Sequence, residues 1–418
     1  MGVVARAGRS LLLTLSLVSA TAGGAEREVA PGDDALVRAL AAAAPGDTLV
    51  LLPGDHAGPV VIDRPLTIEG RAGARIVGPG HGRVVTVDAP DVRLSGVTVT
   101  GSGLTLASED SGVFVTARGE RARIEANRLL GNLIGVNLKG PRDARVSDNR
   151  IEGRRDLRMN ERGNGVQVWN APGSVVADND IRFGRDGIFV TTSRGNVFRG
   201  NRLSELRFAV HYMYTDDSEV SANVSRGNHI GYAIMFSHRI EVLGNVSDGD
   251  RDRGLLFNYA NDSHIRGNRV LPAAEKCVFL YNANGNVLSG NRFEGCETGI
   301  HFTAGSEGNT IAGNAFVANR NQVKYVGTRV VEWSADGRGN YWSDNTDFDL
   351  NGDGIAERPY RPNDLVDHLV WRHPLARLLL ASPAMHLLAA AQSQFPGLHP
   401  GGVRDSAPLM SPPPETRR

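Results

Sequence analysis

Lysine is scarce in this chain: three occur, at positions 139, 276 and 324, so almost all of the 46 basic residues are arginine. The same number of acidic residues balances them, and a formal net charge of zero gives no electrostatic case for binding nucleic acid or an anionic surface. Aromatic residues are few, and the 3.6-residue apolar spacing of a helical solenoid is missing. Fifty glycines instead favour many turns and thin strands.

Long apolar runs are also absent, apart from a short one at the N-terminus. Two arginines precede the run LLLTLSLVSA (11–20), and small residues follow it, so residues 1–25 are predicted to be a signal peptide, cleaved after Ala25 or Ala22. No later stretch approaches the ~18 apolar residues that span a bilayer. We expect an exported, soluble protein; an uncleaved membrane anchor is the alternative.

Cysteine is nearly absent too, with only Cys277 and Cys296. In an oxidising compartment this pair can form a disulfide. A chain of this size does not need one, and the spacing alone leaves the question open.

What the sequence does contain is a repeat. Asparagines in the frame G-N-x-hydrophobic recur every 22 residues and then every 23 residues, at Asn127, Asn149, Asn179, Asn201, Asn223, Asn245, Asn268, Asn291 and Asn314, with one 30-residue gap that holds a polar insertion at 154–163. Short strands such as GIFV, AVHY and GLLF precede them. This period predicts an all-β fold, a right-handed parallel β-helix of 22–23 residues per coil, in which each asparagine amide bonds to the next.

The ends of such a solenoid need covers. Residues 33–47 read as a short N-terminal capping helix. The β-helix is expected over 26–330, followed by an Asp/Asn/Trp-rich loop region at 331–372. Residues 373–418 read as a helical segment, whose leucines are suited to capping the last coil, and a Pro-rich extended tail.

Alternation within the strands sorts inward from outward side chains. An outward column is expected to run through Phe189, His211, Met235, Leu256 and Phe279, with Met213 and Tyr281 in the neighbouring column. This alignment makes His211 and Met235 direct neighbours. An exposed apolar column usually marks an interaction surface, so Phe189, Leu256, Phe279 and Tyr281 are candidate partner-binding residues.

Thioether and imidazole donors on that face favour the soft ion Cu(I). His211, Met213 and Met235 form a three-coordinate candidate site, with His229 or His238 as a fourth ligand. The alternative is that these side chains only contact a partner protein or lie beneath a loop.

Two patterns of carboxylate residues favour functions other than copper binding. The D-x-N-x-D-G frame at Asp349, Asn351 and Asp353, with Glu357, resembles a calcium loop, although Tyr360 stands where an EF-hand has glutamate; a plain turn is the alternative. Asp216-Asp217 and the NTD at 345–347 resemble parts of a polysaccharide-cleaving site. They lie in a turn and beyond the last coil, so the acid and base of a glycosidase are not paired.

Several segments resemble the NosD family, periplasmic accessory proteins of nitrous-oxide reductase maturation. The resemblance covers nearly the whole mature chain and is carried by HYMYTDD (211–217), GNHIGYAIMFS (227–237), GLLFNYANDS (254–263), GIHFTAGSEGN (299–309), the long segment 337–371 and FPGLHPGGVRDSAPLM (395–410).

The resemblance implies a non-enzymatic β-helix that works with an ABC-type permease and ATPase in the inner membrane. Together they would assist copper delivery to apo-nitrous-oxide reductase, with a copper chaperone upstream. We expect the tail at 395–410, including Pro396 and Pro400, to bind the permease. The remaining alternatives are a carbohydrate-active lyase, epimerase or hydrolase, and a scaffold that never binds metal.

Overall fold

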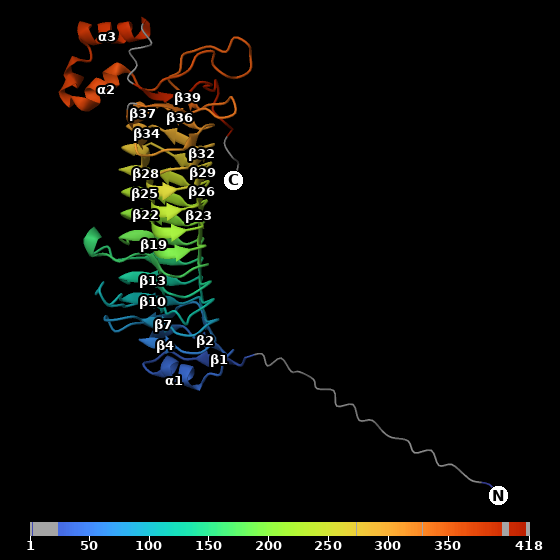
Figure 1. Cartoon of the computed structure of the whole chain (residues 1–418). Helices are drawn as coiled ribbons and strands as arrows, with labels where there is room; N and C mark the ends of the chain where they lie inside the picture. The colour runs from blue at the N-terminus through green and yellow to red at the C-terminus, as the bar shows by residue number, and fades with distance from the viewer. Residues whose placement is uncertain (1, 3–23, 273, 328, 395–400, 415–418) are drawn as a thin grey trace.

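The structure, a computed structural model, describes residues 2, 24–272, 274–327, 329–394 and 401–414. Nearly all of the predicted signal peptide, together with Pro396 and Pro400, lies outside these residues. The described chain winds into a long parallel β-helix with three sheets along its length (Figure 1). The prediction of an all-β parallel β-helix is confirmed.

Each coil contributes one strand to each sheet, and every pairing within these three sheets is parallel. Sheet 1 contains β1 (Glu26–Val29), β2 (Thr48–Leu51), β5 (Thr67–Gly70), β8 (Arg93–Ser95), β11 (Arg123–Glu125), β14 (Arg145–Ser147), β17 (Val175–Ala177), β20 (Val197–Arg199), β23 (Ser218–Ser221), β26 (Ile240–Leu243), β29 (His264–Arg266), β32 (Val287–Ser289) and β35 (Thr310–Ile311). Sheet 2 contains β4 (Val60–Ile62), β7 (Val85–Val87), β10 (Ser111–Val115), β13 (Ile134–Lys139), β16 (Val166–Trp169), β19 (Asp186–Arg194), β22 (Phe208–Asp216), β25 (Ile230–His238), β28 (Arg253–Asn261), β31 (Lys276–Tyr281), β34 (Thr298–Thr303) and β37 (Asn321–Val326). Sheet 3 contains β3 (Gly54–Ala57), β6 (Ala74–Val77), β9 (Thr98–Thr100), β12 (Arg128–Leu130), β15 (Arg150–Glu152), β18 (Asp180–Arg182), β21 (Arg202–Ser204), β24 (Val224–Arg226), β27 (Val246–Asp248), β30 (Arg269–Val270), β33 (Arg292–Glu294), β36 (Ala315–Val317) and β39 (Tyr341–Trp342). The insertion at 154–163 holds the short 3-10 helix η1 (Met159–Glu161).

The core is a stack of inward side chains from successive coils. In sheet 2, Val210 lies beside Ile188 on one side and Tyr232 on the other, and Tyr212 lies between Val190 and Ile234. All of them are fully buried. Strands this short cannot bury a face alone, so the stacking of like coils supplies the hydrophobic core.

The recurring asparagines of successive coils are hydrogen-bonded to one another as predicted, and this row of side chains is called the asparagine ladder. Asn223 shows the pattern: its Oδ1 accepts from the backbone N–H and the Nδ2 of Asn201, at 2.9 Å each. Its own Nδ2 donates to the Phe198 carbonyl at 2.8 Å and to Asn245 Oδ1 at 3.0 Å. The ladder continues past Asn314 to Asn340, whose Oδ1 accepts from the Asn314 backbone at 3.0 Å.

The N-terminal end is covered by helix α1 (Ala35–Ala42), within the segment predicted to be a helical cap. Leu36 and Leu40 face the core and are buried. Helix α1 contacts β1, β3 and β4, so its apolar side closes the first coils.

The C-terminal end is closed by the tail and not by the helical segment. Strand β40 (Gly402–Arg404) pairs in parallel with β38 (Val330–Glu332). Asp405 then accepts the Asn340 backbone N–H at 2.7 Å and Trp342 Nε1–H at 2.8 Å. Val403 and Leu409 are buried. The prediction of an extended tail is therefore wrong for residues 402–410, because they pack against the end of the β-helix. Binding of the segment 395–410 to a permease stays a prediction.

The helical segment forms a small unit beyond the last coil (Figure 1). It consists of α2 (Leu365–Arg372), the 3-10 helix η2 (Pro374–Leu379) and α3 (Pro383–Gln394), with α2 packed against both others. The leucines expected to cap the solenoid are largely exposed: Leu375 by 81%, Leu378 by 84%, Leu379 by 57% and Leu387 by 71%. None of the described helices is long and apolar enough to span a membrane.

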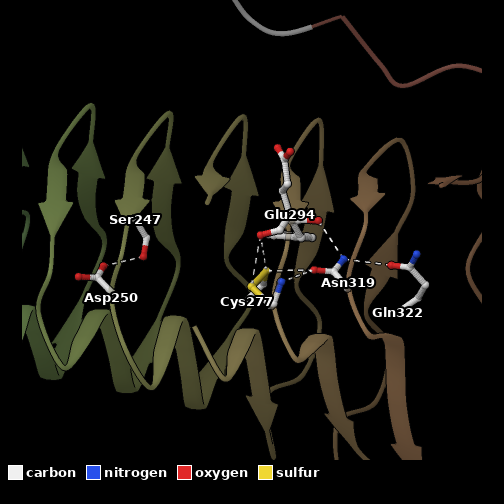
Figure 2. The surroundings of a disulfide bond; sticks show 8 residues. Ser247, Asp250, Cys277, Glu294, Asn319 and Gln322 are labelled. Atoms are coloured by element: carbon white, nitrogen blue, oxygen red, sulfur yellow. Dashed lines mark hydrogen bonds between the residues drawn. A yellow bond between two sulfur atoms is a disulfide. The ribbon is translucent and has the colours of Figure 1, made fainter. Parts of the chain in front are cut away.

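The two cysteines form a disulfide between successive coils. Cys277 lies in β31, and Cys296 precedes β34; both are buried. Figure 2 shows Asn319 next to the bridge. Its Oδ1 accepts the Cys296 backbone N–H at 2.9 Å, and its Nδ2 donates to Gln322 at 3.0 Å. The question that the sequence left open is answered in favour of pairing.

Candidate functional site

The candidate copper residues lie on the outer surface of sheet 2. Tyr212 precedes Met213 and Ile234 precedes Met235, and both of these preceding side chains are fully buried. Alternation along the strands therefore turns Met213 and Met235 outward, and both methionines are half-buried. They are register partners on β22 and β25. Neighbouring strands in a sheet lie ~4.8 Å apart, so two thioethers stand side by side on this face.

The predicted pairing of His211 with Met235 is wrong. His211 lies beside Ala233, and Met235 lies two residues further along the strand, opposite Met213. The mistake came from aligning AVHY with AIMF, which are 24 residues apart, although the asparagine ladder has a 22-residue period in this region. The ladder spacing pairs Val210 with Tyr232 and would have given the observed register.

The observed register also places Phe236 outside the core. It sits at a corner with φ of 50° and stacks between Tyr214 and Tyr259, with ring centroids 5.1 and 5.3 Å away. Tyr281 continues this row with an edge contact to Tyr259 at 6.0 Å. A row of aromatic side chains therefore borders the methionine pair.

His211 faces outward but is covered. Its side chain is only 10% exposed, and its ring lies 4.6 Å from the ring of Phe208 and 5.1 Å from that of Phe189. Its Nδ1 is 3.0 Å from the buried carboxylate of Asp186.

Asp186 holds this group together. Its two oxygens also accept from Arg207 Nε at 2.8 Å and Nη2 at 2.7 Å. Burial opposes the charge of Asp186, but the hydrogen bonds from His211 and Arg207 outweigh it and lower the pKa of this carboxyl. A histidine that donates Nδ1–H to a carboxylate presents an unprotonated Nε2, the arrangement typical of metal-ligating histidines. Sequence reasoning missed Asp186 because it lies a full coil away.

The two further histidines lie at opposite ends of β25. His229 precedes the strand and is 3.7 Å from Asp252, whereas His238 ends it, 3.4 Å from Asp216 and 3.3 Å from Asn261. They cannot both join one metal site. Asp217, the other aspartate of the predicted turn, pairs with Arg239 at 2.5 Å.

The predicted partner-binding residues divide into two groups. Leu256 is buried in an outer apolar cluster with Ile230 and Ala233, against which Phe208, Met235 and Phe279 pack. Phe189 and Phe279 are half-buried, while Tyr281 is exposed by 42%. The face is thus a packed apolar surface with an exposed aromatic margin.

His301 continues the column beside Phe279, with ring centroids 4.7 Å apart. Burial, reinforced by Lys324, Lys276 and Arg253, lowers the pKa of His301 to about 4. This imidazole is therefore neutral near pH 7. It stands three strands beyond Met235 and is separate from the methionine pair.

The predicted calcium loop forms a series of tight turns. The Asp349 carboxylate accepts backbone N–H groups of Gly352 and Gly354, and Asp353 accepts that of Ile355 at 2.8 Å. Asn351 accepts the Asp353 N–H, and Glu357 accepts that of Leu350 at 3.2 Å. Across the described residues, no group of three or more His, Cys, Asp and Glu side chains is arranged to hold a metal ion. Calcium binding stays a prediction.

Taken together, the fold and the site define a parallel β-helix protein that presents paired thioethers and a carboxylate-held imidazole on a lateral sheet. Residues 147–346 match the family model described as "Periplasmic copper-binding protein (NosD)". The chain is 41% identical to the "Probable ABC transporter binding protein NosD" of Stutzerimonas stutzeri, over 87% of this chain and 86% of that one. It is 42% identical to the protein of the same name from Pseudomonas aeruginosa, over 86% of this chain and 87% of that one. The chain belongs to the NosD family.

Solved structures support the fold alone. The surface adhesin PfbA of Streptococcus pneumoniae is similar with a TM-score of 0.55 and 10% identity, over 70% of this chain and 87% of that one. A variant of DFA-IIIase from Arthrobacter chlorophenolicus A6 is similar with a TM-score of 0.50 and 16% identity, over 69% of this chain and 90% of that one. A surface adhesin and DFA-IIIase share this architecture, so the fold does not decide the function. The two relatives above are named as binding proteins.

Proposed function

We propose that this chain is a periplasmic copper-delivery factor for nitrous-oxide reductase. It receives Cu(I) from a periplasmic copper chaperone, acts with an ABC-type permease and ATPase in the inner membrane, and passes copper to apo-nitrous-oxide reductase. The family description as copper-binding and periplasmic supports the cargo and the compartment. The relatives' name supports the transporter.

One observation carries the proposal: Met213 and Met235 are outward register partners, with His211 two residues along the same strand. Soft thioethers prefer Cu(I), and the His211 ring is oriented by Asp186 for coordination through Nε2. The site is open to the surface at the methionines, which suits a cargo that must be handed on. No turnover chemistry is required of such a factor.

The test is an anaerobic Cu(I) competition titration of the mature chain against a chromophoric chelator. Met213→Leu/Met235→Leu keeps the side-chain volume and removes both sulfurs, so we expect at least a tenfold loss of affinity. Met410→Leu, at a methionine 36% exposed in the tail, is the matched control and should bind as the wild type does.

Equal affinity of the double variant and the wild type would place the copper site elsewhere. A wild-type chain that binds no Cu(I) would leave a scaffold that never touches the metal.

A further inference from the structure

The aromatic side chains beside the methionine pair stand at a corner of the coil that does not require aromatic residues. The outward column of Met213 is followed, in successive coils, by a residue with a positive φ between 45° and 90°: Gly140, Asn170, Thr192, Tyr214, Phe236, Tyr259 and Asn282. Glycine and asparagine adopt this left-handed conformation most readily, and a bulky side chain there is an outlier. Since the same corner forms with glycine, asparagine or threonine, the fold does not explain why three consecutive coils carry an aromatic ring.

These rings form one continuous surface, here called the aromatic row: Tyr214, Phe236, Tyr259 and Tyr281. Phe236 stacks between Tyr214 and Tyr259, and the edge of Tyr281 contacts Tyr259. The three tyrosines are 55%, 43% and 42% exposed. Tyr281 also lies in the same outward column as Met235, two strands further on. The aromatic row is therefore exposed on the face that carries the two thioethers.

The stacking decides which class of partner the aromatic row fits. Both faces of the Phe236 ring are covered by rings nearly parallel to it, at interplanar angles of 18° and 9°. A ligand that stacks flat, such as a nucleobase or a sugar ring, needs a free ring face, and the centre of the row offers none. The row presents ring edges and tyrosine hydroxyls, and tyrosine is enriched in protein–protein interfaces. The partner that suits this surface is another protein.

We infer that the aromatic row is the docking surface for the chaperone that delivers Cu(I) to Met213 and Met235. This inference rests on the proposed function and names the surface on which its first step takes place. A metal ion passes between two proteins by ligand exchange, so the donor must come into contact with the side chains exposed around the receiving sulfurs. On one side of the methionine column His211 and Leu256 are buried, whereas on the other side the aromatic row is exposed.

The donor of copper is a more specific assignment than any copper-exchanging protein. Before loading, the methionine pair holds no ion that could itself attract a partner. Recognition of the donor therefore falls to the side chains around the two sulfurs, and the exposed ones are those of the aromatic row.

The experiment follows Cu(I) transfer to the mature chain by stopped flow from two donors, the cognate copper-loaded chaperone and a small Cu(I)–chelator complex. The variant Tyr214→Thr/Phe236→Thr/Tyr259→Asn gives each corner a residue that a neighbouring coil carries there, as in Thr192 and Asn282, so the turn is retained. We expect transfer from the chaperone to slow by about tenfold or more, as when aromatic interface anchors are removed. Transfer from the chelator and the equilibrium Cu(I) affinity should match the wild type.

Phe348→Thr is the matched control, because Phe348 is an aromatic residue 64% exposed in the loop after β39, beyond the last coil. It should leave transfer from both donors unchanged. Circular dichroism and thermal unfolding establish that both variants keep the β-helix.

Unchanged transfer from the chaperone in the triple variant would overturn the docking surface while leaving Cu(I) binding intact. Equal slowing with both donors would also overturn it, because the row would then act on the copper ligands and not on the partner. Normal loading combined with slower transfer to apo-nitrous-oxide reductase would assign the row to the acceptor in place of the donor. A wild-type chain that takes no Cu(I) from the chelator would overturn the proposed function and this inference together.

Discussion

Asp250 stands where the preceding coil has an asparagine, Asn228. Its Oδ1 accepts the Asn228 backbone N–H at 2.8 Å, and its Oδ2 accepts the hydroxyls of Ser225 and Ser247, each at 2.6 Å. Figure 2 shows the Ser247 contact. Burial is the dominant influence and raises the pKa of Asp250 despite these hydrogen bonds. The folded protein therefore binds a proton here more tightly than the unfolded chain does.

This raised pKa makes stability depend on pH in a definite direction. The stabilisation that comes from protonation of Asp250 in the folded state is fully present below the ordinary pKa of an aspartate. It is lost from the free energy of unfolding as pH rises through the raised pKa. Asp250→Asn removes the buried charge and lets the amide donate to Ser247, as Asn228 Nδ2 already donates to Ser225 at 2.8 Å. We expect the variant to be more stable than the wild type at pH 7, by about 1 kcal/mol, with a smaller gain at pH 4. Urea unfolding at the two pH values is the measurement, and parallel pH profiles for the two proteins would contradict the assignment.

The exposure and orientation of the His211 ring are set by its neighbours. From its strand position it is an outward imidazole, but the rings of Phe208 and Phe189 cover it and Asp186 fixes its Nδ1. Under the proposed function, its Nε2 is the candidate ligand near the thioethers. The orientation depends on a residue 25 positions earlier, which no local pattern joins to it.

At the scale of the element, the asparagine ladder fixes each coil to the next. Asn223→Ala would leave the Asn201 N–H and the Phe198 carbonyl without their partners in the buried interior. Each unsatisfied buried group costs about 1–3 kcal/mol, so we expect a loss of about 3 kcal/mol in the free energy of unfolding.

Asn160→Ala, at an exposed residue of η1, is the control for this substitution and should change the free energy by less than ~0.5 kcal/mol. Chemical unfolding followed by circular dichroism measures both. Similar losses in the two variants would mean that the ladder does not carry the stability we attribute to it.

Sheet 2 is the element that carries the candidate copper residues. Its strands β19, β22, β25 and β28 are nine residues long, whereas most strands of sheets 1 and 3 have three or four. The longer strands present more outward positions per coil, so His211, Met213 and the aromatic row occupy one continuous face. The alternation of side chains could be predicted from the sequence; the pairing of Met213 with Met235 could not be read from the strand sequences alone.

At the scale of the whole molecule, the tail (described over residues 401–414) covers the C-terminal end of the hydrophobic core. A chain truncated after Gln394 loses β40 and the Asp405 carboxylate, which leaves the Asn340 N–H and Trp342 Nε1–H without an acceptor. A solenoid transmits damage mainly to neighbouring coils. We expect faster amide hydrogen exchange at Asn340 and Asn314 and unchanged exchange at Asn149.

Truncation after Pro414 keeps every tail contact described above and serves as the control. Full protection of Asn340 in the shorter protein would show that the last coil is stable without the tail.

The sequence by itself determined the coil, its period, its inward and outward faces and its polar ladder, because each of these depends on residues that recur within 22 or 23 positions. It also placed histidine and methionine on the outer face. The strand sequences alone left open which side chains meet there, since a displacement of two residues keeps the alternation and changes every neighbour; the 22-residue spacing of the asparagines is the sequence signal that fixes this register. Only the tertiary structure decided that the tail, and not the helical segment, closes the last coil. That choice depends on contacts such as Asn340 with Asp405, 65 residues apart and outside any repeat.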